Sequence, residues 1–399
     1  MTVLLTVIMI GGGLFDVLSD KWEKMRERLN GAEKRVVTNM MAYEKGAEES
    51  VRRNGMVELA ATQPSDLGLI RPALLADMKT VMVRALDDSK WKVRASACSA
   101  LWKLSVSEAR DKLLKVVAKD PMRFVRAQAA LALSTVAGKG DGEATAVLCK
   151  ALSSDGWSVV RRAAAEALSH IGDKRAFETL RKAADSDSYS TVRSEALDAA
   201  VRLGDRSQAL KEVALKRLND DYSRVRISAC RAIAALGMSE TAPKLVELLN
   251  DKKYPVRVAA GKALAAVATA AQQQAIFDAL KATEDVGLLC TLIDTLDRIG
   301  TPEATAKIKE YVSHADRSVR WAATMALAGR GDADGLKMLE DYLRKHGSMR
   351  TRQMLALMRQ RKIKHPKVLA LLKKCASACD DESMKKEYEK TLKVLEAGD

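Results

Sequence analysis

Residues 155–170 read DGWSVVRRAAAEALSH, and the fold follows from this stretch because its pattern returns along the chain. With Arg161 as the origin, an aspartate lies six residues before it and a valine immediately before it. Alanines lie three and six residues after it. The offsets −1, +3 and +6 share one face of a helix. Alanine on that face lets a neighbouring helix approach closely, so the stretch predicts a helix packed against another helix.

The pattern recurs at seven arginines, each preceded by valine: Arg94, Arg126, Arg161, Arg193, Arg226, Arg257 and Arg320. The aspartates six residues before them are Asp88, Asp120, Asp155, Asp187, Asp220 and Asp251, and His314 takes this place before Arg320. The first six arginines are 31 to 35 residues apart, and the last follows after 63, nearly twice that spacing, so one unit fits two helices and a turn. One such unit cannot bury its apolar face alone and must stack on its copies. We therefore predict an all-α fold, a right-handed α-solenoid (superhelix) of about nine or ten helix pairs.

This repeat resembles the HEAT repeat family, in the short form also found in phycobilin lyases and deoxyhypusine hydroxylase. The resemblance covers roughly residues 71–331. It implies that the thirteen aspartates and arginines of the two columns form a ladder between neighbouring repeats.

Four segments are expected from the way the repeat fades at both ends. They are an apolar N-terminal segment (1–20), a helical cap with a degenerate repeat (21–70), the solenoid (71–331) and a basic C-terminal degenerate repeat with capping helices (332–399). Residues 1–15 carry no charge, but they are too few to span a bilayer. We expect them to dock or to make a weak membrane contact. The six cysteines lack disulfide-framework spacing, which predicts a reducing, cytoplasmic location.

Catalytic and metal-binding motifs are missing from the sequence. It contains no phosphate-binding glycine loop, no HExxH and no GxSxG. Deoxyhypusine hydroxylase binds di-iron through His-Glu motifs, but none of the four histidines here precedes a glutamate. Cys375 and Cys379 share a helical face, yet zinc requires four ligands. We predict no enzyme activity, no cofactor, no metal and no small-molecule substrate.

Aromatic residues are rare but recur two to four positions before the repeat arginines. They are Trp91, Phe124, Trp157, Tyr189, Tyr222 and Tyr254. They either line one ridge as a contact strip for an extended peptide or for bases, or each fills the turn of its own repeat.

The C-terminal region is strongly basic. Residues 344–374 contain eleven of the 67 lysines and arginines and no acid, in a chain of net charge +15. We predict an anionic contact at Arg350, Arg352, Arg359, Arg361, Lys362 and Lys364. Pro366 disfavours helix at the residue before it, so this cluster should end one helix and enter a turn.

Side chains two, five and nine residues after each arginine are predicted to line the concave face. They are small, mixed and near neutral, as Ser96, Ser99 and Lys103 illustrate. A groove that tracks phosphates would be rich in lysine and arginine. We therefore expect a non-enzymatic scaffold or adaptor that binds another protein, with nucleic acid or an anionic membrane surface left open as partners of the basic end. The alternatives are a nucleic-acid-binding solenoid and a phycobilin-lyase-like accessory protein.

Overall fold

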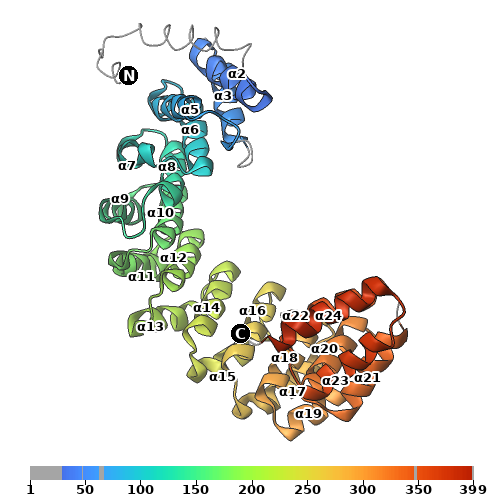
Figure 1. Ribbon diagram of the computed structural model, residues 1–399. Helices are drawn as coiled ribbons and strands as arrows, with labels where there is room; N and C mark the ends of the chain where they lie inside the picture. Colours follow the sequence, from blue (N-terminus) through green and yellow to red (C-terminus); the bar gives the residue numbers. More distant parts are fainter. Residues whose placement is uncertain (1–28, 47, 63–66, 346–347, 398–399) are drawn as a thin grey trace. The chain divides into compact units, whose positions relative to one another are not determined.

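The computed structural model describes residues 29–46, 48–62, 67–345 and 348–397, and every regular element within these ranges is helical (Figure 1). The predicted all-α solenoid is confirmed. The chain forms two compact units that divide between Val213 and Ala214, inside α13 (Gln208–Arg217). Each unit is described below by itself.

The first unit is a series of helix pairs. The first helices of the pairs are α2 (Gly31–Lys45), α5 (Pro72–Arg84), α7 (Arg110–Lys119), α9 (Gly142–Ser154) and α11 (Phe177–Ser186). The second helices are α3 (Glu49–Ala60), α6 (Trp91–Leu104), α8 (Arg123–Val136), α10 (Ser158–Ile171) and α12 (Ser190–Leu203). Short 3-10 turns precede α7 and α11 at Ser107–Ala109 (η3) and Lys174–Ala176 (η4), and a third follows α5 at Ala85–Asp87 (η2).

The second unit continues the same alternation. Its first helices are α15 (Ala242–Leu248), α17 (Gln273–Ala282), α19 (Pro302–Lys309), α21 (Ala333–Lys345) and α23 (Pro366–Ser377). Its second helices are α14 (Ser223–Leu236), α16 (Tyr254–Val267), α18 (Val286–Ile299), α20 (Arg317–Gly329), α22 (Ser348–Gln360) and α24 (Glu382–Glu396). The turns η5 (Ser239–Thr241) and η6 (Ala270–Gln272) precede α15 and α17.

The second helices pack on one another through their alanines. In the first unit α6, α8, α10 and α12 are in contact in that order, and in the second unit α14, α16, α18 and α20 are. The alanines at +3 and +6, such as Ala164 and Ala167, are completely buried. A larger side chain at these positions would have to displace the neighbouring helix, because protein interiors are close-packed.

Glycines in the left-handed conformation, a typical helix-end signal in a sequence, end several second helices. Gly172, Gly204 and Gly300 follow α10, α12 and α18 with φ of 80°, 93° and 75°. The predicted turn after the basic cluster is also confirmed, since α22 ends at Gln360 and α23 begins at Pro366. His365 caps α23 by accepting a hydrogen bond from the backbone N–H of Lys367.

The predicted apolar segment 1–20 lies outside the described residues, and the segment boundaries at 21–70, 71–331 and 332–399 stay predictions. No helix in the described part of the chain is long and apolar enough to cross a membrane.

Candidate functional site: the arginine ladder and the aromatic row

Repeat arginines bind the aspartate of the following repeat through both oxygens of its carboxylate. Nε and Nη2 of the arginine donate to Oδ2 and Oδ1 at 2.7–3.0 Å. The pairs in the first unit are Arg94–Asp120, Arg126–Asp155 and Arg161–Asp187, and Arg226–Asp251 in the second unit has the same geometry. Two parallel charge-assisted hydrogen bonds fix both the distance and the orientation of the two groups.

Each arginine–aspartate pair, called a rung here, also makes hydrogen bonds to the backbone of the two turns that it joins. Nη1 of Arg126 donates to the carbonyl of Asp120, at the start of its own repeat, at 2.8 Å. Oδ1 of Asp155 accepts the backbone N–H of Trp157 at 3.0 Å, directly before α10. These side chains are only 14% and 10% exposed. One rung therefore joins two successive turns and the N-terminus of the next helix.

The other predicted ladder residues lie at the same turns. Arg193 donates through Nη1 to the carbonyl of Asp187 at 2.8 Å, and Asp220 accepts from the N–H of Tyr222. Arg257 donates to the carbonyl of Asp251 at 3.0 Å. Arg320 donates to the carbonyls of His314 and Ala315 at 2.6 and 2.7 Å.

One rung of the first unit was missed in the sequence. Arg52, in the degenerate early repeat, binds both carboxylate oxygens of Asp88 at 2.8 and 3.2 Å. Its Nη1 donates to the carbonyl of Gly46, which stands where an aspartate would be expected. The Val-Arg pair at 51–52 was the available signal.

A second set of ion pairs joins the first helices and was also missed. Arg110 of α7 binds Asp141, the N-cap of α9, at 2.6 Å, and Arg181 binds Asp205 at 2.8 Å. In the second unit Lys309 binds Asp332 at 2.8 Å. The hydrogen bonds from Arg110 lower the pKa of Asp141 to about 2. Asp205 and Asp332 follow a glycine that ends a second helix, and this dipeptide was the available sequence signal.

The six aromatic rings lie at the starts of the second helices, and five of them are 43–57% exposed: Phe124, Trp157, Tyr189, Tyr222 and Tyr254. In the first unit, Trp91 and Phe124 stack with their centroids 6.0 Å apart. The Arg123 guanidinium lies 4.9 Å from the Phe124 ring and 3.8 Å from the Trp157 ring. We call Trp91, Phe124, Trp157 and Tyr189 the aromatic row. The exposure of the rings favours a contact strip over rings that fill their turns.

Two arginines of the basic C-terminal cluster pair with acids from helices far away in the sequence, so their charges are not unpaired as the local sequence suggested. Arg361 binds both oxygens of Asp294 on α18 at 2.9 and 3.1 Å. Arg359 binds Glu387 of α24 at 2.7 Å. Outside the six predicted contact residues, Lys374 and Lys373 pair with Glu340 and Glu396, and Arg344 also pairs with Glu340.

The other four predicted contact residues are exposed. Arg352 donates to the hydroxyl of Ser383 at 2.6 Å, and Lys362 and Lys364 make further interactions. Only Arg350 among the six has no hydrogen bond or ion pair with another described residue. Buried surroundings raise the pKa of Asp294 despite its arginine partner. Arg359 and Arg361 thus join the C-terminal helices to their neighbours, and an anionic contact at the six residues stays a prediction.

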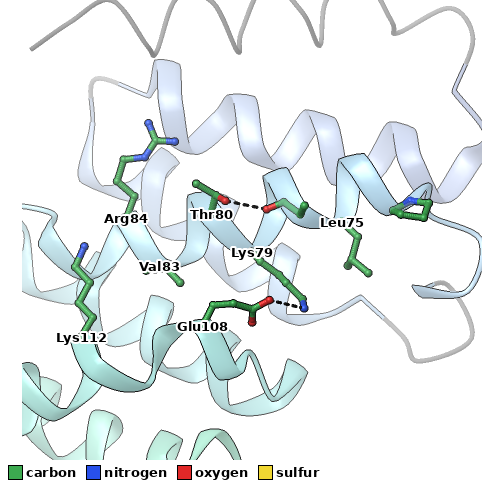
Figure 2. A pocket seen from close by; sticks show the side chains of 9 residues that line it. Leu75, Lys79, Thr80, Val83, Arg84, Glu108 and Lys112 are labelled. Carbon is green, nitrogen blue, oxygen red and sulfur yellow. Dashed lines mark hydrogen bonds and ion pairs between the residues drawn. The ribbon is translucent and has the colours of Figure 1, made fainter. Parts of the chain in front are cut away.

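A cavity of about 510 Å³ lies beside α5, where it meets η3 and α7 (Figure 2). Leu75 and Val83 form part of its apolar lining. The charges around it are paired, since Lys79 binds Glu108 at 3.0 Å, Lys112 binds Asp87, and Arg84 lies 3.1 Å from Glu44. The cavity thus presents apolar surface and leaves no free charge for a ligand.

Some side chains predicted to line the concave face are instead buried between helices. Ala163, Ser228, Ala322 and Met325 are at most 4% exposed. The offset of two residues after the arginine turns toward the neighbouring second helix, because these helices pack so closely. Fewer of these positions are therefore available to line a neutral groove than the sequence suggested.

No group of three or more metal-ligating side chains occurs within the described ranges. The six cysteines are unpaired. Burial raises the pKa of Cys230 to about 12 and of Cys290 to about 11, so neither thiol is activated as a nucleophile.

Comparison with known families shows what the repeating geometry represents. The profile described as HEAT repeats matches six overlapping segments, at residues 46–134, 78–169, 134–201, 212–288, 274–358 and 306–393. The chain belongs to the HEAT repeat family. The matched HEAT segments extend from the early repeat that contains Arg52 to the closing helices. No curated protein sequence matches the chain.

Solved structures with a related fold include large HEAT proteins. Importin beta is 12% identical with a TM-score of 0.56, over 97% of this chain and 60% of that one. A structure of Kap95p with RanGDP gives 11% identity and a TM-score of 0.52, over 97% and 59%. The chain thus spans about three fifths of the length of each. The CpcE–CpcF complex of phycocyanin lyase from Nostoc is 21% identical, over 63% of this chain and 93% of that one, but its TM-score of 0.38 carries no argument.

A double-mutant cycle measures the coupling across one rung. We expect Asp155→Ala to lower the free energy of unfolding by about 3 kcal/mol, because it leaves Arg126 uncompensated and removes the acceptor of the Trp157 backbone N–H. Adding Arg126→Met should cost much less than in the parent, because no uncompensated charge is then left. The measurement is urea unfolding followed by circular dichroism. Arg162→Met is the control, since its pair with Glu166 is exposed and should contribute only a few tenths of a kcal/mol. Strict additivity of the two ladder substitutions would contradict a coupled rung.

The pair of Arg110 and Asp141 predicts an acid-dependent contribution to stability. A carboxyl group whose folded pKa is lowered stabilises the fold above its unfolded pKa, and this contribution is lost as the pH falls through the folded value. Arg110→Gln should therefore lower the stability by about 1 kcal/mol at neutral pH. The difference from the parent should disappear between about pH 4 and pH 2. Thermal unfolding against pH tests this, with Lys182→Gln in an exposed pair as control. A difference that persists unchanged at pH 2 would show that Arg110 acts by packing alone.

Proposed function

We propose that this HEAT protein is a non-enzymatic scaffold that holds an extended segment of another protein against the aromatic row. The observation that carries the proposal is the row itself, which has one large ring per repeat beside the ladder, and Phe124, Trp157 and Tyr189 are about half exposed. Exposed aromatic rings in a continuous array are typical of interaction surfaces, and tryptophan and tyrosine are enriched among residues that dominate binding energy.

The row is held rigidly before any partner binds. Trp157 and Tyr189 each lie two residues after a ladder aspartate, whose side chain accepts their backbone N–H at 3.0 and 2.9 Å. Arg123 lies between the rings of Phe124 and Trp157. Because these groups are ordered by the ladder, little conformational entropy is lost when a partner covers them.

The repeat distance selects a conformation for the bound segment. Packed helices lie about 8–10 Å apart, and the stacked rings of Trp91 and Phe124 are 6.0 Å apart, so successive rings are presented at intervals of about 6–10 Å. A polyproline II helix rises about 3.1 Å per residue and returns to the same face every third residue, after about 9 Å. Aromatic-lined surfaces are known binding sites for such segments. The row therefore suits a proline-rich segment with contacts at every third residue.

Nucleic acid is a less suitable occupant of this surface. A site for single-stranded nucleic acid combines stacking rings with free cations that follow the backbone. Here Arg94, Arg126 and Arg161, beside the rings, are engaged by aspartates, and Arg123 is the cation that lies directly against the rings. We also propose a cytoplasmic location and no cofactor, since the cysteines are unpaired and no activated side chain accompanies the row.

Peptide selection tests the proposal directly. A displayed library of random peptides should enrich sequences with proline or an apolar residue at every third position. A selected peptide should bind Trp157→Ala/Tyr189→Ala at least about tenfold more weakly than the parent, as expected for two central aromatic contacts. Fluorescence anisotropy measures the affinity. The melting temperature should change little, because both rings are already half in water.

Trp102→Ala provides the matched control. Trp102 is 42% exposed and lies at the other end of α6 from Trp91. Its replacement should leave peptide affinity unchanged. The proposal fails if the double variant binds as tightly as the parent. It also fails if single-stranded RNA or DNA binds the parent in a way that the double variant loses while no peptide is enriched.

A further inference from the structure

A small pocket in the second unit contains a ladder arginine that binds no carboxylate among the residues that the structure describes. The pocket has a volume of about 210 Å³ and is lined by α20, α21 and α22. Three arginines line it, Arg317, Arg320 and Arg350. Two aromatic residues accompany them, Trp321 and Tyr342, whose rings meet edge to face with centroids 4.7 Å apart. This inference does not rest on the proposed function, because the pocket and the aromatic row share no residue.

Arg320 is anchored in the same way as the arginines of the filled rungs. Its Nη1 donates to the backbone carbonyls five and six residues before it, as Nη1 of Arg126 does. In the filled rungs, Nε and Nη2 then bind a carboxylate of the next repeat. In Arg320 these two nitrogens have no partner among the described residues.

The sequence explains why the rung is unfilled. In the filled rungs the aspartate follows the arginine by 25 to 29 residues. The corresponding positions after Arg320 read Lys-His-Gly-Ser-Met, with no acid. Arg317 and Arg350 likewise form no ion pair within the described part of the chain. The nearby acid Glu340 is already bound by Arg344 and Lys374.

A second, independent observation also indicates an unfilled site. The indole nitrogen of Trp321 is buried and has no hydrogen-bond partner in the described structure. A buried N–H without an acceptor costs about 1–3 kcal/mol, and indole nitrogens normally find a partner when they are buried. Trp321 is also one of the residues that line the pocket.

We propose that this pocket binds an aspartate or glutamate side chain of a partner protein, which takes the place of the missing ladder aspartate. The ladder itself identifies the ligand, because the arginines of the filled rungs bind a side-chain carboxylate through the same two nitrogens. The pocket volume of about 210 Å³ agrees with a ligand as small as one side chain, because it is below the roughly 300–1,000 Å³ of pockets for drug-sized ligands. The aromatic and methionine walls, including Met338 and Met354, would pack on the aliphatic part of the bound residue.

A titration followed by NMR tests the assignment on the full chain labelled with ¹⁵N tryptophan and arginine. The probe is N-acetyl-aspartate N′-methylamide. We expect it to shift the indole signal of Trp321 and the Nε–H signal of Arg320 with one shared saturation curve. The assignments come from Trp321→Phe and Arg320→Lys. The isosteric asparagine probe, which lacks the charge, should shift neither signal.

Variants and two further probes decide the outcome. Arg320→Gln should weaken binding of the aspartate probe by about tenfold or more, as expected when hydrogen bonds to a charged group are lost. Arg298→Gln, an exposed arginine on α18, should leave it unchanged. N-acetylglycine tests a C-terminal carboxylate, and inorganic phosphate tests a phosphate site. The proposal is overturned if either of these binds more tightly than the aspartate probe, or if no probe shifts Arg320.

Discussion

The bidentate pair between an arginine of one repeat and an aspartate of the next is the interaction on which the rest of this structure depends. The aspartate ends one turn and accepts the backbone N–H of the residue that precedes the following helix, while the arginine reaches back to the carbonyl of its own turn. A single pair therefore sets the position of the second helix relative to its predecessor. The alanine faces can then pack at close range, because the register between neighbouring helices is already fixed.

The periodic residues made the core of the fold predictable. Val160, Arg161 and Ala164 carry the helical face, the contact partner and the close approach in one short stretch, and these are local properties. Gly172 and Gly204 mark the ends of two helices, and this signal is also local. The ends of the solenoid were harder, since Arg52 retains the rung although its own turn has Gly46 in place of the aspartate.

Long-range compensation could not be read from the sequence. The stretch around Arg361 contains no acid, yet Asp294 lies 67 residues away on a helix that packs nearby. Sequence reasoning sees charge along the chain, whereas pairing depends on neighbours in space. The aromatic rings show a related limit, because periodicity places Trp157 at the start of a helix but does not say whether its ring faces water.

The ladder also divides the charged residues into two functional classes. Where a rung is filled, as with Arg226 and Asp251, the charges stabilise the stack and are unavailable to a partner. Where the aspartate column is interrupted, the same arginine geometry is left open, as at Arg320. At Arg257 the column is interrupted as well. The next repeat has Leu289 in place of the arginine and Thr283, six residues earlier, in place of the aspartate.

Native-state hydrogen exchange in increasing denaturant is the most direct test that rungs couple neighbouring repeats. In the second unit α14 and α16 are joined by Arg226 and Asp251, while α16 and α18 are in contact without a carboxylate rung. The account predicts that the amides of α14 and α16 become exposed together, in one cooperative opening, and that α18 opens at a different denaturant concentration. If α14, α16 and α18 open together, or if α16 opens with α18 and not with α14, packing alone couples the repeats and the ladder does not.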